Sequence, residues 1–437
     1  MTNPDLLLAM TEAEIGREII RLVPHWYDAP YGPEQYTIPI GGHTARFCNH
    51  CRLTPNLRAF LSKICARTMA LPLEHFVNLP SLIDVLLESF AIEWLRMHSL
   101  TTDWVRFIRY LETLTRRTYE NQPVALNLII RQGTGLGDIT RPHIQKFFDR
   151  LASSAFSYLA VDSDLRLIDY GEVEWSQIKA ATSYKFHPEF LHPIHSVMDE
   201  SDLSAHLTTS GDLIIMSKAG LLATRRNRKW KIYDVRTFKN SLAYCLGGHY
   251  VGANLFEVVF DLSFRRQGSL LIYDPDYLVA AHILNPESII REDYRRKALG
   301  GDGPLPRTIA SAAGSPGAVG WPKTGSRPET GQAMIVDSIA DISIGRKAGS
   351  LRRKRRLIEM SGVDGAVVFD DDHLLAVGAL IRSHPNVGNH LGARVTAARS
   401  AYLWGGRPIK VSSDGDVAVF FKSRNGDNEC DAVMNFL

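Results

Sequence analysis

Five short apolar segments between residues 268 and 421 constrain the fold of this chain more than any other feature. They are GSLLIY (268–273), GAVVFD (365–370), HLLAVGALI (373–381), RPIKVSS (407–413) and DVAVFF (416–421). Runs of this length, rich in Val, Ile and Leu and bounded by turn residues, are typical of β-strands. Asp414-Gly415 between two alternating runs predicts a tight hairpin. A helical pattern near 251–266 leads into the first strand and another at 392–404 lies between the third and fourth, so we expect an α/β domain with a mixed sheet.

The first half of the chain has a different pattern. Up to about residue 120 it is mostly helical in character, and apolar residues recur near the 3.6-residue period at Leu82, Val85, Leu86, Phe90 and Ile92. Beyond residue 123, strand patterns dominate, as in VALNLIIR (124–131) and SYLAVDSDLRLIDY (157–170). This half is therefore predicted to be α+β.

These patterns give a domain plan. We predict an N-terminal α+β domain over 1–240, an α/β domain over 241–425 and a C-terminal tail over 426–437. Residues 299–332 are crowded with Gly, Pro, Ser and Thr and almost free of large aliphatic side chains. Such a composition cannot bury enough apolar area to order itself, so it predicts a flexible insertion in the second domain.

Composition excludes several classes of protein. Hydrophobic residues make up 45% and charged residues 22%, which excludes a disordered, collagen-like or coiled-coil chain. The net charge of +3, from 50 basic and 47 acidic residues, provides no global basic field, so we do not expect nucleic acid as a partner. Five cysteines, no signal-peptide pattern and no bilayer-length apolar run predict a cytoplasmic protein without a membrane partner.

Asp364-Gly365-Ala366 is the first group that could carry chemistry. The tripeptide opens the predicted strand 365–370, and the two small residues would let a ligand approach the backbone closely. A carboxylate there could hold Mg²⁺ or Mn²⁺ against phosphate oxygens, or help to deprotonate a sugar hydroxyl. The alternative is a simple turn with a solvated aspartate.

The second group is the predicted helix start Gly392-Ala393-Arg394-Val395-Thr396. Free backbone N–H groups and the positive end of the helix dipole would bind phosphate there, and Arg394 adds a forked cationic donor. Thr396 adds a hydroxyl. A closely packed helix with a surface arginine remains the alternative.

Ser412-Ser413-Asp414 forms a third group, at the end of the strand that follows this helix. Asp414 could be a second metal carboxylate. It is equally explained as a turn residue, since Asp-Gly is favoured in hairpins.

Together and in this order, the segments resemble the diadenylate cyclase domain. The chain shows FRRQGSLLIY, then SGVDGAVVFDDDHLLAVGALI, then LGARVTAARSAYLWGGRPIKVSSDGDVAVFF. These correspond to the family's GA-bearing strand, DGA strand, GTRHR-type helix start and VS-plus-acid hairpin. The resemblance covers residues 251–421, and the insertion 299–332 is foreign to it. The first half resembles the sensor-like regions found before some cyclases of this type.

The resemblance implies an activity and a set of site residues. Each domain would bind one ATP with Mg²⁺ or Mn²⁺, and two domains facing each other as a homodimer would make cyclic di-AMP and release pyrophosphate. It implies Asp364 and Arg394 as catalytic residues and Asp364 and Asp414 as metal ligands. The implied nucleotide-binding residues are Gly365, Ala366, Gly378, Leu380, Gly392, Ala393, Thr396 and Ser412, with 378–380 as the adenine-side wall.

The helix start departs from the family pattern. Gly392 and Arg394 match, whereas Ala393 replaces the usual Thr, Val395 the usual His and Thr396 a second Arg. A hydroxyl and a cation are therefore missing or relocated. The alternative function is a nucleotide-binding signalling regulator of the same fold that has lost or altered turnover.

Two other motifs have weaker interpretations. Cys48-Asn49-His50-Cys51 has the first half of a zinc-knuckle spacing but lacks a second Cys pair. The basic run Arg352–Arg356 is typical of a solvated helix face, although it could also attract anionic nucleotide or nucleic acid.

Overall fold

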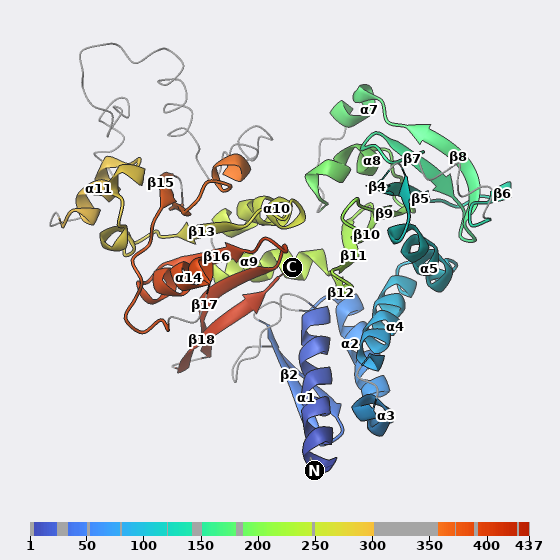
Figure 1. Cartoon of the computed structure of the whole chain (residues 1–437), viewed down its shortest axis with the longest axis horizontal. Coiled ribbons are helices and arrows are strands. Elements are labelled where there is room, and N and C mark those ends of the chain that lie inside the picture. Colours follow the sequence, from blue (N-terminus) through green and yellow to red (C-terminus); the bar gives the residue numbers. More distant parts are fainter. Residues whose placement is uncertain are drawn as a thin grey trace. The chain divides into compact units, whose positions relative to one another are not determined.

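The chain forms two compact units in the computed structural model (Figure 1). Unit 1 consists chiefly of Arg52–Phe238 with two N-terminal segments, and unit 2 chiefly of Lys239–Leu437. The structure describes residues 4–23, 34–49, 53–78, 81–119, 121–141, 151–180, 187–246, 250–300, 357–371, 373–388, 392–425 and 428–436. Most of the insertion predicted at 299–332 lies outside these ranges, as do His50, Cys51 and the basic run Arg352–Arg356.

Helices form the first part of unit 1, as the sequence predicts. They are α1 (Pro4–Leu22), α2 (Pro55–Thr68), α3 (Leu73–Asn78), α4 (Leu82–Arg96) and α5 (Trp104–Thr115). The hairpin β1 (Glu34–Ile40) and β2 (His43–Asn49) follows α1, and the short pair β3 (Thr118–Tyr119) and β4 (Gln122–Pro123) follows α5. The apolar period over 82–92 predicted α4 correctly, and within this helix Val85 is 63% exposed.

An eight-stranded mixed sheet forms the rest of unit 1, in the order β12-β11-β10-β9-β5-β7-β8-β6. Only β5 and β7 among these neighbours are parallel. The strands are β5 (Leu126–Ile130), β6 (Gly137–Asp138), β7 (Ser157–Val161), β8 (Arg166–Glu172), β9 (Leu203–Leu207), β10 (Leu213–Ser217), β11 (Gly220–Arg226) and β12 (Lys229–Ile232). Between them lie α7 (Trp175–Ala180), the 3-10 turn η1 (Glu189–Leu191) and α8 (His192–Ser196).

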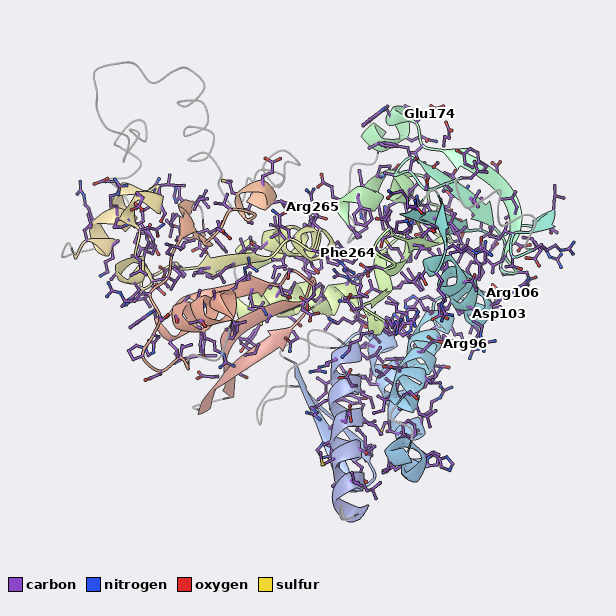
Figure 2. All side chains as sticks on the ribbon, in the orientation of Figure 1. Arg96, Asp103, Arg106, Glu174, Phe264 and Arg265 are labelled. Carbon is purple, nitrogen blue, oxygen red and sulfur yellow. The ribbon has the colours of Figure 1, made fainter. Side chains whose placement is uncertain are left out.

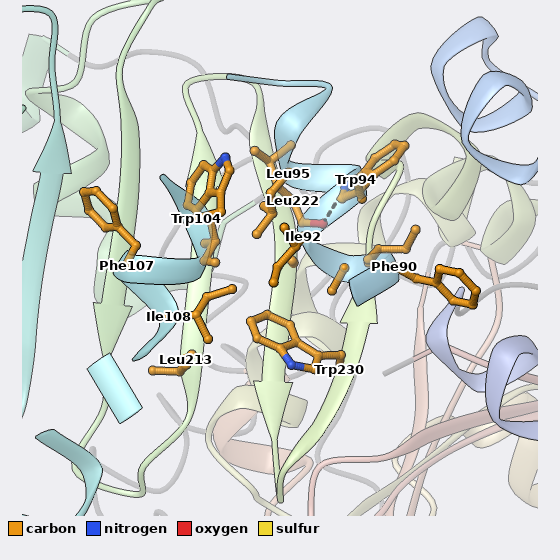
Figure 3. Close-up of a cluster of buried hydrophobic side chains, with 14 of the residues drawn as sticks. Phe90, Ile92, Trp94, Leu95, Trp104, Phe107, Ile108, Leu213, Leu222 and Trp230 are labelled. Atoms are coloured by element: carbon orange, nitrogen blue, oxygen red, sulfur yellow. Dashed lines mark hydrogen bonds between the residues drawn. The ribbon is translucent and has the colours of Figure 1, made fainter. Parts of the chain in front are cut away.

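One apolar core joins the helices of unit 1 to its sheet. Trp94 of α4 is buried against β11, where its indole N–H donates to the carbonyl of Leu222 at 2.9 Å (Figure 3). Trp104 and Phe107 of α5 are also buried in this core. Because apolar residues of both elements are removed from water together, this packing holds α4 and α5 on one face of the sheet.

Unit 2 is built on a six-stranded mixed sheet in the order β15-β14-β13-β16-β17-β18. Its strands are β13 (Ser269–Tyr273), β14 (Ala366–Phe369), β15 (Leu374–Ala379), β16 (Arg407–Val411), β17 (Val417–Asn425) and β18 (Asn428–Asn435). Its helical elements are α10 (Tyr250–Phe264), η2 (Ala280–His282), η3 (Pro286–Ser288), α11 (Glu292–Ala298) and α14 (Ala393–Leu403), and α9 (Val235–Cys245) crosses the boundary between the units.

The two faces of this sheet are covered by different helices. Ala398 and Ala401 of α14 pack with Leu270, Ile272 and Phe420 on one face. On the other face, Cys245 of α9 contacts Met434 of β18 with 3.9 Å between the sulfur atoms. Both units thus belong to the mixed α/β class.

The prediction of a C-terminal tail over 426–437 is corrected by the structure. Residues 428–435 form β18, which pairs with β17 along its whole length. Ala432, Met434 and Phe436 are buried while Asp431 and Asn435 are exposed. This alternation is that of a strand with one buried face, so the segment belongs to the sheet.

None of the helices in the described ranges combines the length and the apolar character needed to cross a bilayer.

Candidate functional site at one edge of the unit 2 sheet

The residues predicted for the site gather at one edge of the unit 2 sheet. Strands β13 and β14 are parallel, with Leu270 beside Ala366, so both strands start at this edge. The antiparallel β15 and β16 end there, because Ala379 pairs with Ala366 and Val411 pairs with Ser269. The segments 364–366, 378–380 and 412–414 therefore meet at the same end of the sheet.

Gly365 and Gly378 let β14 and β15 approach closely at this edge. Gly365 has φ +103° and Gly378 has φ +72°, values that side-chain-bearing residues rarely adopt. A Cβ on Gly365 would lie 2.5 Å from the carbonyl carbon of Gly378. Both glycines are thus required by backbone conformation or by space, and Ala366 is buried at the start of β14.

Asp364 stands exposed at the turn before β14. In the described part of the chain, no group donates a hydrogen bond to its carboxylate and no cation pairs with it. An exposed carboxylate without protein partners can accept a metal ion or a proton from a ligand.

Arg394, in the first turn of α14, reaches the start of β13. Its guanidinium lies so close to Gly268 that a Cβ built there would be 2.3 Å from Nη1 and 2.8 Å from Cζ. The side chain is half-buried, yet the described residues give it no hydrogen bond, ion pair or aromatic contact. A half-buried guanidinium without an anion is an available binding group for phosphate.

The start of α14 adds backbone donors. Gly392 is the N-cap and has no side chain to cap the helix, while its carbonyl accepts from the N–H groups of Val395 and Thr396 at 2.9 and 3.0 Å. The N–H groups of Ala393 and Arg394 have no acceptor in the described ranges. Backbone N–H groups without acceptors at a helix start can bind an anion.

The side chain of Asn285 bonds to the backbone of residues 378–380, the predicted adenine-side wall. Its Nδ2 donates to the carbonyl of Gly378 at 3.0 Å, and its Oδ1 accepts from the N–H of Leu380 at 2.8 Å. The carbonyl of Leu380 accepts from Leu284 at 2.8 Å. These backbone groups are already paired, so a base lying here would meet the 52% exposed Leu380 side chain instead.

Ser412 and Asp414 bond chiefly within their own turn. The Ser412 hydroxyl lies within hydrogen-bond distance of the Asp414 carboxylate and, at 3.0 Å, of the carbonyl of Asp416. The bond from Ser412 lowers the pKa of the Asp414 carboxyl, while partial burial opposes this shift. Gly415 has φ +91° and donates to the carbonyl of Ser412 at 3.0 Å. The hairpin alone thus explains this group locally.

The carboxylates predicted as metal ligands stand on strands separated by β13. Asp364 precedes β14, whereas Asp414 follows β16, so their backbones are about two strand spacings, or roughly 10 Å, apart. No group of three or more His, Cys, Asp or Glu side chains that could hold a metal occurs in the described ranges. Mg²⁺ is commonly held by one or two carboxylates together with substrate phosphates, and Asp364 fits that use.

Three residues that contact the candidate site were not predicted from the sequence: Gln267, Gly268 and Asn285. Gln267 and Gly268 follow the end of α10, where Figure 2 labels Phe264 and Arg265. A Cβ on Gly362 would lie 1.7 Å from the Gln267 amide nitrogen, so Gln267 covers the turn before Asp364. The GA-type pattern at 268–269 was a signal for Gly268, but no local pattern singled out Asn285.

The opposite edge of the sheet carries a network of tyrosines and aspartates. Tyrosine hydroxyls there bond to carboxylates: Tyr294 to Asp274 at 2.7 Å, Tyr273 to Asp371 at 2.6 Å, and Tyr277 to Asp293 and Asp370 at 3.2 Å each. Burial raises the pKa of the Asp274 carboxyl to about 6. Asp274 also accepts from the backbone N–H groups of Leu278 and Val279, so this network is bonded internally.

Comparison with models of known protein families gives no match to this chain. A comparison with curated proteins gives no match either.

Proposed function

We propose that unit 2 binds ATP with Mg²⁺ or Mn²⁺ at this sheet edge and condenses two ATP molecules into cyclic di-AMP with release of two pyrophosphates. The observation that carries the proposal is the half-buried Arg394 guanidinium, which, like the first two N–H groups of α14, has no partner among the residues that the structure describes. Strand β14, the neighbour of β13, starts at the same edge and is preceded by the Asp364 carboxylate, for which the described part of the chain also supplies no partner. A cationic cradle next to a free carboxylate suits a nucleoside triphosphate with its metal.

Each predicted residue has a chemical role in this proposal. Arg394 and the N–H groups of Ala393 and Arg394 bind phosphate oxygens, and Asp364 holds the metal and helps to remove the proton of the attacking 3′-hydroxyl. The metal neutralises phosphate charge when bound. The 3′-oxygen of one ATP bonds to the α-phosphorus of the other, and the bond from that phosphorus to the bridging oxygen breaks to release pyrophosphate.

The other residues shape the pocket in the proposal. Gly392, where a Cβ would meet no atom within 4 Å, leaves room for the nucleotide, and the Leu380 side chain supports adenine. Gly365 and Gly378 let the two strands approach closely beside Ala366, which shapes the floor of the proposed site. Thr396 and Ser412 supply hydroxyls, and Asp414 a second carboxylate near the phosphates. Because each half-reaction needs a second ATP of opposed polarity, two unit 2 domains face each other in a homodimer. Unit 1 regulates this pairing as a sensor-like region.

Mass spectrometry of products tests the proposal directly. The purified full chain is incubated with ATP and Mn²⁺, with Arg394→Ala as the matched variant. We expect cyclic di-AMP from the unmodified protein and little from the variant. Absence of nucleotide binding by calorimetry as well as absence of product would refute the proposal.

A second candidate function is a nucleotide-binding regulator without turnover. The first turn of α14 favours it, since Ala393 and Val395 supply no hydroxyl or cation where the resemblance leads one to expect them. A stable complex with ATP and metal that yields no product would support this function.

A further inference from the structure

Gly268 is a glycine that its own backbone does not require. Gly365 and Gly378 have positive φ values, but Gly268 is not among the residues with positive φ. A residue with a side chain could therefore adopt its conformation without strain. What a side chain at this position would change is the group that it contacts.

That contact is the guanidinium of Arg394. A Cβ on Gly268 would lie 2.3 Å from Nη1, 2.8 Å from Cζ and 3.1 Å from Nη2. Since all three atoms are near the same point, the guanidinium lies over the Gly268 backbone. Ordinary contact begins near 3.4 Å, so a methyl group at this position would displace the charged group by roughly 1 Å.

The position of this contact matters for the site. Gly268 immediately precedes β13, which lies between β14 and β16 in the sheet. The guanidinium is therefore held at the start of the strand that separates Asp364 from Ser412. It has no partner in the described ranges that could hold it in place, so a side chain at position 268 could displace it without breaking a hydrogen bond or an ion pair there.

We propose that Gly268 is a positioning residue of the nucleotide site, and that its missing side chain sets where the Arg394 guanidinium meets the phosphates of ATP. This inference rests on the proposed function for its ligand. The contact between the two residues does not depend on that function. A displacement of about 1 Å in a charged binding group can cost up to 10²-fold in activity.

A double-mutant cycle on ATP binding tests the proposal. Gly268→Ala, Arg394→Ala and the double variant are compared by calorimetry with ATP and Mg²⁺. We expect each single change to weaken binding about tenfold or more, and the second change to add less than twofold once Arg394 is gone. Equal effects of Gly268→Ala with and without Arg394 would overturn the proposal, as would unchanged binding.

Gly137→Ala is the matched control, because a Cβ there meets no atom within 4 Å. It should leave binding and melting temperature unchanged.

A readout without nucleotide separates this inference from the proposed function. The rate at which phenylglyoxal modifies Arg394 is followed by peptide mass spectrometry. Gly268→Ala should raise this rate several-fold, since the displaced guanidinium becomes more exposed. If the unmodified protein does not bind ATP, the proposed function fails. If the modification rate is the same in both proteins, the positioning role of Gly268 fails.

Discussion

His206 provides a prediction whose magnitude can be worked from the structure. It lies in β9 with 1% of its surface exposed. Its Nδ1 is 2.8 Å from the Asn127 side-chain oxygen, and its Nε2 is 2.8 Å from the Ser204 hydroxyl. Burial, with a smaller contribution from the charge of His195, lowers the pKa of His206 from 6.5 to about 3. The folded protein therefore holds this ring neutral at every pH above about 3.

The lowered pKa sets the direction of the pH effect. Above pH 6.5 the ring is neutral in both states, so it contributes no pH dependence. Below pH 6.5 only the unfolded chain binds the proton, so the free energy of unfolding falls by about 1.4 kcal/mol per pH unit. Relative to pH 6.5, His206 thus lowers the free energy of unfolding by about 2 kcal/mol at pH 5 and by about 5 kcal/mol near pH 3.

Urea unfolding at pH 7.5 and pH 5, followed by tryptophan fluorescence, measures this loss. His206→Gln cannot take up the proton, so its stability should fall by about 2 kcal/mol less between the two pH values than that of the unmodified protein. His75→Gln, at an exposed position in α3, is the control and should change the difference little. Equal pH dependence of His206→Gln and the unmodified protein, or an NMR titration of His206 near pH 6.5, would refute the reasoning.

Three further predictions concern unit 2. Asp364→Asn should keep the melting temperature and lower metal-dependent product formation by about 10² or more, measured by mass spectrometry; product at the unmodified rate would contradict the role of Asp364. Specific activity should rise with protein concentration until the dimer saturates, and Arg394→Ala should reduce ATP-promoted dimerisation in light scattering; cyclisation by a strict monomer would contradict this. Gly365→Ala should lower the free energy of unfolding by about 2 kcal/mol or more, because Gly365 has a positive φ and a Cβ there would clash with Gly378. Gly388→Ala is the control and should have little effect, since a Cβ there meets no atom within 4 Å. Equal urea midpoints for Gly365→Ala and the unmodified protein would contradict this prediction.

Strands β13 to β17 were predictable because each is a short aliphatic run between turn residues. The predicted run 365–370 became β14 (Ala366–Phe369), and the hairpin at Asp414-Gly415 joins β16 to β17. The last strand was missed although Ala432, Met434 and Phe436 alternate with polar residues. It lies in the segment 426–437 that was predicted to be a tail, and pairing with β17 shows that it is a strand. Long-range pairing decided the outcome there, not local propensity.

In unit 1, the sequence predicted helix α4 but not which of its apolar residues face the core. The period predicted α4, but Val85 faces solvent while Ile83, Leu87 and Ala91 face the core. A helix covered on several sides has apolar residues around most of its circumference. The exposed position then depends on neighbours that the local pattern does not contain.

The sequence predicted which segments lie at the candidate site, but it did not predict the contacts between those segments. The order of the DGA, GAR and SSD segments placed them in one domain, and strand directions brought them to one edge. The contact of Gly268 with Arg394, and that of Asn285 with Gly378, join segments more than 90 residues apart. Such contacts depend on the register of neighbouring strands, which a single sequence does not specify.

The two edges of the unit 2 sheet use their polar groups in opposite ways. At the carboxyl ends of β13 and β14, the Asp274 carboxylate is buried and accepts from Tyr294 and from two backbone N–H groups. At the other edge, Asp364, the Arg394 guanidinium and two amides of α14 have no partner in the described ranges. Groups as strongly polar as a half-buried guanidinium are normally paired in folded proteins. The contrast between the two edges, as far as the described residues show it, therefore supports the proposal that an anionic ligand binds at the second one.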